Sequence, residues 1–205
     1  MNRLLAFALV FSLLAVLTAP AAEPIYLDQA WTDADRQSYY YLPQGSEVMP
    51  YPWFLALEQA TTSKPFCDAD HIESFRFIPN WAGKANPDGL PVGFAKGRGQ
   101  DGQDWFGLTC AACHTGQFTY EGKAVRVDGG TTLADMIGFQ SALVTALRST
   151  LDQAAKFDRF ARQVLGDRHT PAAATALAGK VRDQLQVMAD WEGRNRPAHP
   201  SGFGN

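Results

Sequence analysis

The pentapeptide Cys110-Ala111-Ala112-Cys113-His114 constrains this chain more than any other feature of its sequence. A C-x-x-C-H run is the pattern by which a c-type haem is attached to a protein. One turn of helix places the two thiols so that each can form a thioether with one haem vinyl group. The adjacent histidine then faces the iron as its proximal ligand. The sequence therefore predicts one covalently attached haem c, held by Cys110, Cys113 and His114, with His114 as the metal ligand.

Two other uses of paired cysteines compete with haem attachment. A thioredoxin-like redox pair needs a βαβ context that the sequence pattern does not indicate. Half of a zinc site needs two more ligands, and Cys67 and His71 could complete a Cys-Cys-Cys-His set from an expected helix. Haem is the preferred interpretation, because an export signal together with C-x-x-C-H is more specific than either feature alone.

The first 22 residues are expected to be an export signal that does not belong to the fold. Arg3 gives a short positive start, the segment from Leu4 to Leu17 is almost entirely apolar, and Ala19-Pro20-Ala21 offers small residues for cleavage. The alternative is an uncleaved membrane anchor, but the apolar segment is shorter than the roughly 20 residues of a spanning helix. We therefore expect a periplasmic or secreted protein without a stable membrane anchor.

The charge balance bears on the partners of the chain. Its 205 residues include 18 Lys and Arg and 21 Asp and Glu, a net charge of -3, and losing Arg3 with the signal makes this -4. Nucleic acid is not an expected partner, because no basic excess exists to neutralise phosphates. An acidic surface suits a redox partner protein with a basic surface. The three cysteines are an odd number, which excludes a dense disulfide framework.

The residue pattern predicts a mainly α, cytochrome c-like helical haem domain with long loops. Residues 24–45 are expected to form an extended arm, and short helices are expected over residues 51–60 and 68–77. The segment 79–104 is rich in glycine and proline and is expected to be a loop. No strand alternation of useful length is recognised.

Three helices are expected after the C-x-x-C-H motif. The first starts at Thr132, with Asp135 as its capping-box partner, and the second covers residues 151–165 and stops at Gly166. The third has Thr170 as its cap and Pro171 in its first turn. The expected organisation is a signal peptide (1–22), a c-type cytochrome domain (23–193) and a polar tail (194–205) that looks like the start of a missing second haem domain.

Further residues are expected to complete the haem site. Trp105, Phe106 and Leu108 could pack on the ring, and the Arg126 guanidinium could pair with a haem propionate. Weaker propionate candidates are Arg76, Lys84 and Lys96. The sixth iron position decides between electron transfer and catalysis, and its candidates are Met49, Met136, Met188, His71, His169 and His199. Cys67 is interpreted as a small buried apolar residue, with an intermolecular disulfide as the alternative.

Several blocks of the chain resemble the di-haem cytochrome c peroxidase superfamily, particularly its rubber-oxygenase-like branch. The resemblance runs from about Tyr39 to Phe160 and covers most of the mature chain. It is carried by the segments Leu42-Pro43-Gln44-Gly45-Ser46, Tyr51-Pro52-Trp53-Phe54-Leu55-Ala56-Leu57-Glu58, Asn86-Pro87-Asp88-Gly89-Leu90-Pro91-Val92-Gly93-Phe94, Gly107-Leu108-Thr109-Cys110-Ala111-Ala112-Cys113-His114-Thr115 and Arg126-Val127-Asp128-Gly129-Gly130.

This resemblance implies a haem domain equivalent to the N-terminal, reactive half of such proteins, with peroxidase- or oxygenase-like chemistry. The chain departs from the family in carrying one C-x-x-C-H instead of two, and the common distal histidine has no match. It is expected to be either a truncated fragment or a one-haem descendant. Three functions follow: an exported mono-haem cytochrome for electron transfer, a haem-dependent enzyme with an open distal iron site, and a non-catalytic haem sensor. The first is preferred because it needs only the motif.

Overall fold

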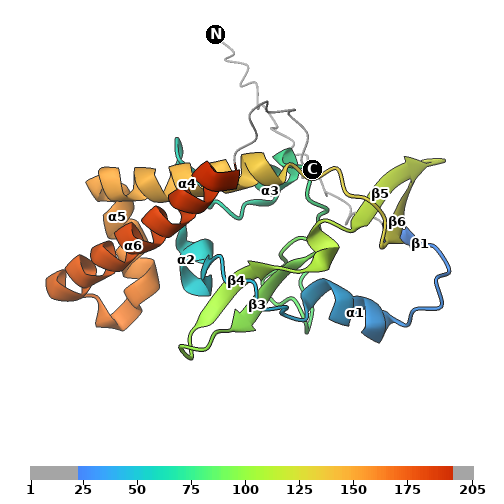
Figure 1. Cartoon of the computed structure of the whole chain (residues 1–205), viewed down its shortest axis with the longest axis horizontal. Helices are drawn as coiled ribbons and strands as arrows, with labels where there is room; N and C mark the ends of the chain where they lie inside the picture. The colour runs from blue at the N-terminus through green and yellow to red at the C-terminus, as the bar shows by residue number, and fades with distance from the viewer. Residues whose placement is uncertain (1–22, 196–205) are drawn as a thin grey trace, which may run out of the picture.

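A computed structural model describes residues 23–195 of the chain. Figure 1 shows the three long C-terminal helices packed together at one end and a small sheet at the other, with a second sheet between them. In chain order the elements are β1 (Ile25–Tyr26), α1 (Asp33–Tyr41), β2 (Met49–Pro50), α2 (Tyr51–Ala56), α3 (Ala69–Ser74), β3 (Phe94–Arg98), β4 (Asp104–Leu108), η1 (Cys110–Ala112), β5 (Thr115–Tyr120), β6 (Lys123–Asp128), α4 (Met136–Asp152), α5 (Ala154–Leu165), η2 (Gly166–Arg168) and α6 (Pro171–Asn195).

The expectation of a mainly α, cytochrome c-like domain is wrong. Helices make up about 47% of the described residues and strands about 17%, and two three-stranded sheets make this an α/β fold. The sequence pattern does not predict the strands because they are short and lie partly in the glycine-rich segment that was expected to be a loop. Pairing with distant segments, rather than a local alternation of apolar and polar residues, holds such strands in place.

Each sheet is built around one antiparallel hairpin. In the first sheet, of order β1-β6-β5, the turn Glu121-Gly122 has φ angles of 47° and 74°. Two successive positive φ angles are typical of the tight type I′ hairpin turn. Strand β1 adds to this hairpin in parallel with β6. In the second sheet, of order β2-β4-β3, Met49 pairs with Phe106 and Phe94 with Leu108.

The segment predicted to be an extended N-terminal arm contains a helix, α1, so that prediction is wrong. Thr32 caps this helix, because its side chain accepts a hydrogen bond from the Asp35 amide while the Asp35 carboxylate accepts from the Thr32 amide. This reciprocal arrangement is a capping box, which is a helix-start signal visible in the sequence.

The three C-terminal helices are confirmed, with two corrections. Helix α5 begins at Ala154 and not at residue 151, because residues 151 and 152 end α4. Helix α4 begins at Met136 and is capped by Asp135, not by Thr132. Gly166 ends α5 with a φ of 52°, and the Thr170 hydroxyl accepts a hydrogen bond from Ala173 N at the start of α6. The expected boundary at residue 193 falls within the last turn of α6, and the expected signal peptide lies outside the described residues.

An aromatic core joins the helices to the second sheet. Phe54 stacks on Phe106 with their ring centroids 3.9 Å apart, and Phe139 of α4 packs near Phe94 at 5.4 Å. The core phenylalanines, each at most 2% exposed, are Phe54, Phe66, Phe77, Phe94, Phe106, Phe139 and Phe160. Within residues 23–195, no helix is both long enough and apolar enough to span a membrane.

Candidate functional site

The C-x-x-C-H motif occupies the turn between the two sheets, after β4 and before β5. The Cys110 carbonyl accepts hydrogen bonds from Cys113 N at 3.2 Å and His114 N at 2.8 Å, which closes a single helical turn. Thr109 caps this turn, since its hydroxyl accepts from Ala111 N at 3.2 Å. Neither motif cysteine is in a disulfide; Cys110 is exposed, Cys113 is half-buried and His114 is exposed.

Two distant segments fix the ends of the motif through main-chain hydrogen bonds. The Gln44 side-chain carbonyl accepts from Cys110 N at 2.9 Å. At the other end, the His114 carbonyl accepts from the Tyr39 hydroxyl at 2.6 Å and from Gly129 N at 2.8 Å. The blocks that carried the family resemblance, around Gln44 and Gly129, therefore meet at the motif.

Gly93 supports the motif from behind. Its carbonyl accepts a hydrogen bond from Thr109 N at 2.8 Å. A Cβ atom on Gly93 would lie 2.1 Å from the amide nitrogen of Ala112, and the φ angle of Gly93 is 82°. Only glycine satisfies both the positive φ and this close approach.

The second cysteine of the motif is the more shielded of the two. Burial, together with the neighbouring Cys110, raises the pKa of the Cys113 thiol. A raised pKa lowers the fraction of Cys113 present as the reactive thiolate.

The zinc alternative finds no support in the described part of the chain. Cys67 lies half-buried just before α3, and His71 packs edge-on against Phe66 and Phe75 with ring centroids 4.8 and 5.1 Å away. Among residues 23–195, no group of three or more His, Cys, Asp and Glu residues is placed to hold a metal ion. Cys67 and His71 therefore do not complete a ligand set with Cys110 and Cys113.

Arg126, the expected propionate partner, is 1% exposed on β6. Its Nε donates to Gln117 Oε1 at 2.9 Å, and its Nη2 donates to the Pro79 carbonyl at 3.2 Å. The guanidinium keeps further N–H donors beyond these two bonds, and its pairing with a propionate stays a prediction. Of the weaker candidates, Lys96 pairs with Asp104 at 3.1 Å, Arg76 donates to the Leu133 carbonyl at 2.6 Å, and Lys84 is exposed.

Sequence reasoning missed a buried ionic cluster two residues beyond Arg126. Asp128 is 2% exposed and accepts hydrogen bonds from Arg36 Nε at 2.9 Å and from the Tyr40 hydroxyl at 2.5 Å. Burial and the Asp128 carboxylate raise the pKa of Tyr40. This cluster ties α1 to β6, one residue before Gly129, whose amide bonds to the His114 carbonyl. No local sequence signal links residues so far apart.

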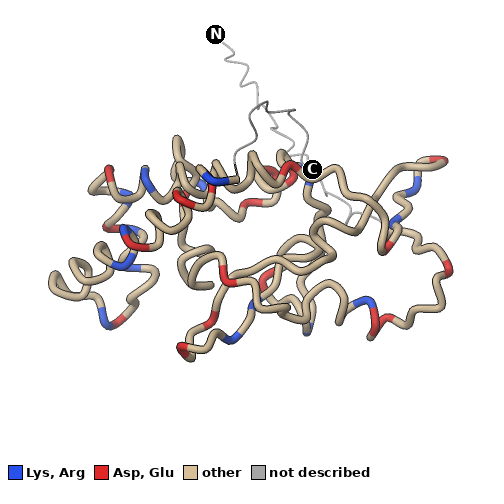
Figure 2. The backbone as a smooth tube through the Cα atoms, in the orientation of Figure 1, with Lys and Arg blue, Asp and Glu red and all other residues tan. Residues whose placement is uncertain are grey.

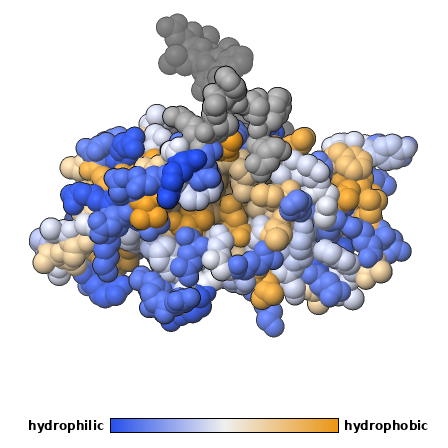
Figure 3. All heavy atoms as spheres, viewed as in Figure 1, coloured by the Kyte–Doolittle hydropathy of each residue, from blue (hydrophilic) through white to orange (hydrophobic). Residues whose placement is uncertain are grey.

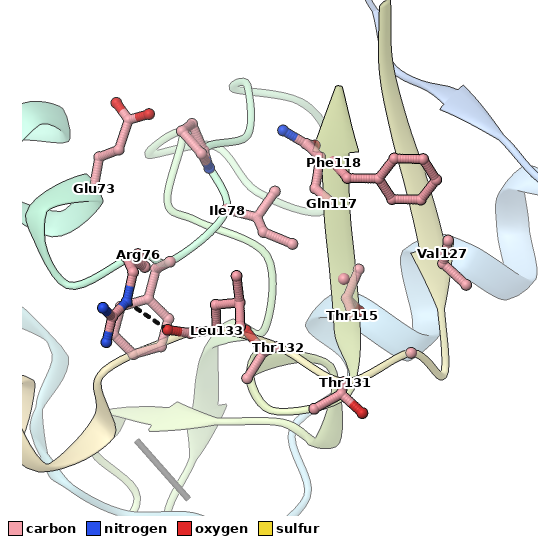
Figure 4. A pocket seen from close by; sticks show the side chains of 14 residues that line it. Glu73, Arg76, Ile78, Thr115, Gln117, Phe118, Val127, Thr131, Thr132 and Leu133 are labelled. Atoms are coloured by element: carbon pink, nitrogen blue, oxygen red, sulfur yellow. Dashed lines mark hydrogen bonds between the residues drawn. The ribbon is translucent and has the colours of Figure 1, made fainter. Parts of the chain in front are cut away.

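Two hollows adjoin the strands on either side of the motif. The larger, of about 670 Å³, lies between the end of α3 and the edge of β5. In Figure 4, Ile78 and Gln117 lie across from each other over this hollow, while Phe118 points away from it. The smaller, of about 290 Å³, is an apolar groove between the end of β4 and helices α4 and α6, lined by Val48, Leu108, Gln140, Val144, Val187, Met188 and Trp191 together with Ser46, Glu47 and Gln184.

The residues present fit a covalently attached haem. The two thiols are unlinked and one turn apart, the imidazole is exposed, and Leu108 extends the apolar groove to within two residues of Cys110. Binding sites for cofactors are mostly apolar hollows of about 300–1,000 Å³. The two hollows beside the motif are of this order.

The sixth-ligand candidates are scattered over the fold. Met49 is fully buried in β2, Met136 is the half-buried first residue of α4, and Met188 lines the apolar groove. His71 is the aromatic-packed residue described above, and His169 lies in the connection before α6. His199 lies outside the described residues. Among the candidates within residues 23–195, Met188 is the one that shares a hollow with Leu108, two residues before Cys110.

Comparison with known proteins gives one similar sequence. No family model matches the chain, and no solved structure matches it. "Uncharacterized protein y4iJ" from Sinorhizobium fredii (strain NBRC 101917 / NGR234) is 40% identical over 173 residues. The match covers 74% of this chain but only 28% of the relative, so the chain spans less than a third of that protein's length.

Proposed function

We propose that this chain is an exported mono-haem c-type cytochrome domain that binds haem covalently and transfers electrons. Cys110 and Cys113 form the two thioethers, and His114 supplies the proximal nitrogen. When bound, the haem supplies an iron that exchanges single electrons between its ferric and ferrous states. By resemblance, the chain corresponds to the N-terminal haem half of the di-haem cytochrome c peroxidase superfamily.

One observation carries the proposal. The C-x-x-C-H turn holds two free thiols and an exposed imidazole, and every hydrogen bond described above fixes its main chain rather than these side chains. The surrounding protein therefore orients the motif while leaving its reactive atoms available. Covalent attachment suits an exported protein, because a cofactor lost outside the cytoplasm would not be recovered.

The attachment is tested by expressing the full chain in a host with a cytochrome c maturation system. We expect a mass increase of one haem and a Soret band in the wild-type protein, and neither in Cys110→Ala/Cys113→Ala. Cys67→Ala is the matched control and should keep the haem, since Cys67 lies apart from the motif. A full haem adduct in the double variant would refute the assignment.

The proximal ligand is tested separately with His114→Ala. This variant should lose the native Soret spectrum, because the imidazole is the strong-field ligand that His114 supplies. An unchanged spectrum would mean that another residue ligates the iron.

The apolar groove favours a second candidate, a peroxidase- or oxygenase-like enzyme with an open distal position. The groove offers room next to the motif, and Gln140 brings an amide into its lining. Absorption and EPR spectra of the ferric protein discriminate the two functions. A low-spin signal that Met188→Ala converts to high-spin supports electron transfer, whereas a high-spin wild-type signal with rapid peroxide-driven oxidation of a donor dye supports the enzyme.

A further inference from the structure

A polar hollow beside α1 shares no lining residue with the two hollows next to the motif. It measures about 320 Å³ and lies between residues 23–26, helix α1 and residues 80–86. Figure 3 shows hydrophilic residues interspersed with hydrophobic ones over the end of the molecule that carries α1 and β1. Ligand sites are hollows of about 300–1,000 Å³, so the size of this one suits a small molecule.

The wall of this hollow contains polar side chains that are themselves buried. Arg36 and Tyr41 are each 7% exposed, and Asn86 is 5% exposed. Leu90 fixes the Asn86 amide, because Leu90 N donates to Asn86 Oδ1 at 2.9 Å and the Leu90 carbonyl accepts from Asn86 Nδ2 at 2.7 Å. Buried polar groups need hydrogen-bond partners, so this wall suits a ligand that forms hydrogen bonds better than an apolar one.

The Tyr41 hydroxyl has a proton to donate to such a ligand. The side-chain amides of Asn80 and Asn86 both donate to this hydroxyl. A hydroxyl group accepts two hydrogen bonds and donates one, and within residues 23–195 the structure shows no acceptor for the Tyr41 proton. Burial raises the pKa of Tyr41, so the hydroxyl keeps its proton at neutral pH.

The guanidinium in the wall is already offset by carboxylates. Arg36 Nε donates to Asp128 Oδ2 at 2.9 Å, and Arg36 Nη1 donates to Asp33 Oδ1 at 3.1 Å. An anionic ligand would therefore gain little from Arg36, and it would meet the carboxylate of Asp33, which lines the hollow.

The rest of the rim also mixes charges of both signs. Glu23 lines the hollow, and Lys84 lies exposed in the turn of residues 83–86. Figure 2 shows acidic and basic residues side by side at the start of α1. A cationic ligand would meet Arg36 as an anionic one meets Asp33, so the charges of the hollow favour a neutral ligand.

Trp81 adds a flat apolar surface to this polar lining. Its side chain lines the hollow and is 43% exposed. The face of an aromatic ring is electron-rich and attracts the weakly positive C–H groups on one face of a sugar ring. Sugar hydroxyls both donate and accept hydrogen bonds, and the amides and the hydroxyl of the hollow do the same.

We propose that this hollow is a binding site for a neutral saccharide, whose ring stacks on Trp81 and whose hydroxyls form hydrogen bonds with Tyr41 and Gln37. The inference goes beyond the proposed function and does not rest on it. Because the hollow contains no residue of the C-x-x-C-H motif, sugar binding and haem attachment can fail separately.

The test uses the haem-loaded full chain and isothermal titration calorimetry. Glucose, galactose and mannose are the neutral probes, because they differ only in the orientation of hydroxyl groups. We expect saturable binding of at least one of them, with a dissociation constant on the order of 1 mM. The absence of saturable binding for all three would overturn the proposal.

Charged derivatives of the same ring test whether the site selects a neutral ligand. The uronate of the bound sugar adds a carboxylate, and its 2-amino derivative adds an ammonium group; for glucose these are glucuronate and glucosamine. Both should bind about tenfold more weakly than the neutral sugar, a loss of about 1.4 kcal/mol. Equal or tighter binding of either derivative would overturn the neutral class of ligand.

Variants of the lining locate the bound sugar. Tyr41→Phe and Trp81→Ala should each weaken binding about tenfold, because one removes the hydroxyl and the other the stacking surface. Tyr120→Phe and Trp31→Ala are the matched controls outside the lining, and they should bind the sugar as the wild type does. Gln37→Ala, an exposed substitution, keeps the test decisive where Tyr41→Phe disturbs folding, which far-UV circular dichroism reports. Wild-type affinity in both Trp81→Ala and Gln37→Ala would show that the sugar binds elsewhere.

Discussion

A single glycine determines how closely two parts of the chain approach at the C-x-x-C-H motif. Gly93 combines a φ of 82° with a hypothetical Cβ position 2.1 Å from Ala112 N. Gly122, in the β5–β6 turn, has a φ of 74° but nothing within 4 Å of its hypothetical Cβ. Substituting Gly93 and Gly122 in turn therefore separates the cost of backbone strain from the cost of a steric collision.

Gly93→Ala should therefore destabilise the chain more than Gly122→Ala. For Gly122→Ala we expect a loss of about 1–2 kcal/mol, the cost of the left-handed conformation alone. Gly93→Ala adds a clash with the backbone of the motif, so it should also lower the fraction of chain carrying covalent haem. Urea unfolding and haem content measure the two effects; equal losses of stability would show that the motif moves freely to make room.

The environment of His71 predicts that the stability of the folded chain depends on pH. Its Nε2 is buried without a hydrogen-bond partner in the described structure, and burial lowers the pKa of the imidazole, with Asp68 opposing this. In the unfolded chain the His71 imidazole takes up a proton near its ordinary pKa of about 6.5, whereas in the folded chain it does so only at a lower pH. The contribution of His71 to stability is thus present above pH 6.5 and is lost as the pH falls below it, towards the lower pKa of the folded state.

His71→Phe should remove that dependence while keeping the edge-on contacts with Phe66 and Phe75. The comparison is the difference in melting temperature between pH 7.5 and pH 5.5, which should be smaller in the variant than in the wild type. His169→Asn, in the connection before α6, is the control and should keep the wild-type difference. A variant with an undiminished difference would place the pH sensitivity elsewhere.

At the scale of elements, the buried Asp128 joins α1 to β6. Asp128 accepts hydrogen bonds from Arg36 and Tyr40, while Arg36 also contacts Asp33, whose side chain is fully exposed. Removing one partner of a buried pair leaves an uncompensated charge, which costs about 3–5 kcal/mol. An exposed pair contributes about 0–1 kcal/mol.

Asp128→Asn should therefore cost several times more stability than Asp33→Asn, although both remove a carboxylate from the same arginine. Tyr40→Phe should cost an intermediate amount, about 1–3 kcal/mol, because it leaves one oxygen of the buried carboxylate without its donor. Denaturant unfolding gives the three values. Equal effects of the two aspartate substitutions would mean that Asp128 is not buried against Arg36.

At the scale of the whole molecule, the sequence predicted local features better than the pairing of distant segments. The C-x-x-C-H spacing is local, and both of its thiols are free, with Cys110 exposed and Cys113 half-buried. Helices α5 and α6 were recognisable because their caps, Gly166 and Thr170, are local signals as well. The strands were missed since β1 pairs with β6 across about a hundred residues, and no local pattern records such a pairing. The contacts of Tyr39 and Gly129 with His114 were missed for the same reason.

The separation of the motif from the aromatic core predicts whether the chain folds without haem. A small haem domain commonly uses the cofactor as part of its core, but here Phe54, Phe94, Phe106 and Phe139 bury one another in a cluster that includes neither Cys110 nor Cys113. We therefore expect Cys110→Ala/Cys113→Ala to fold cooperatively, with wild-type far-UV circular dichroism and a lower melting temperature than the haem-loaded chain, since an attached haem makes its packing and ligand contacts in the folded state only. Cys67→Ala should match the wild type in both measurements. A double variant that shows a disordered spectrum and no cooperative transition would mean that the aromatic core does not suffice and that haem attachment completes the fold.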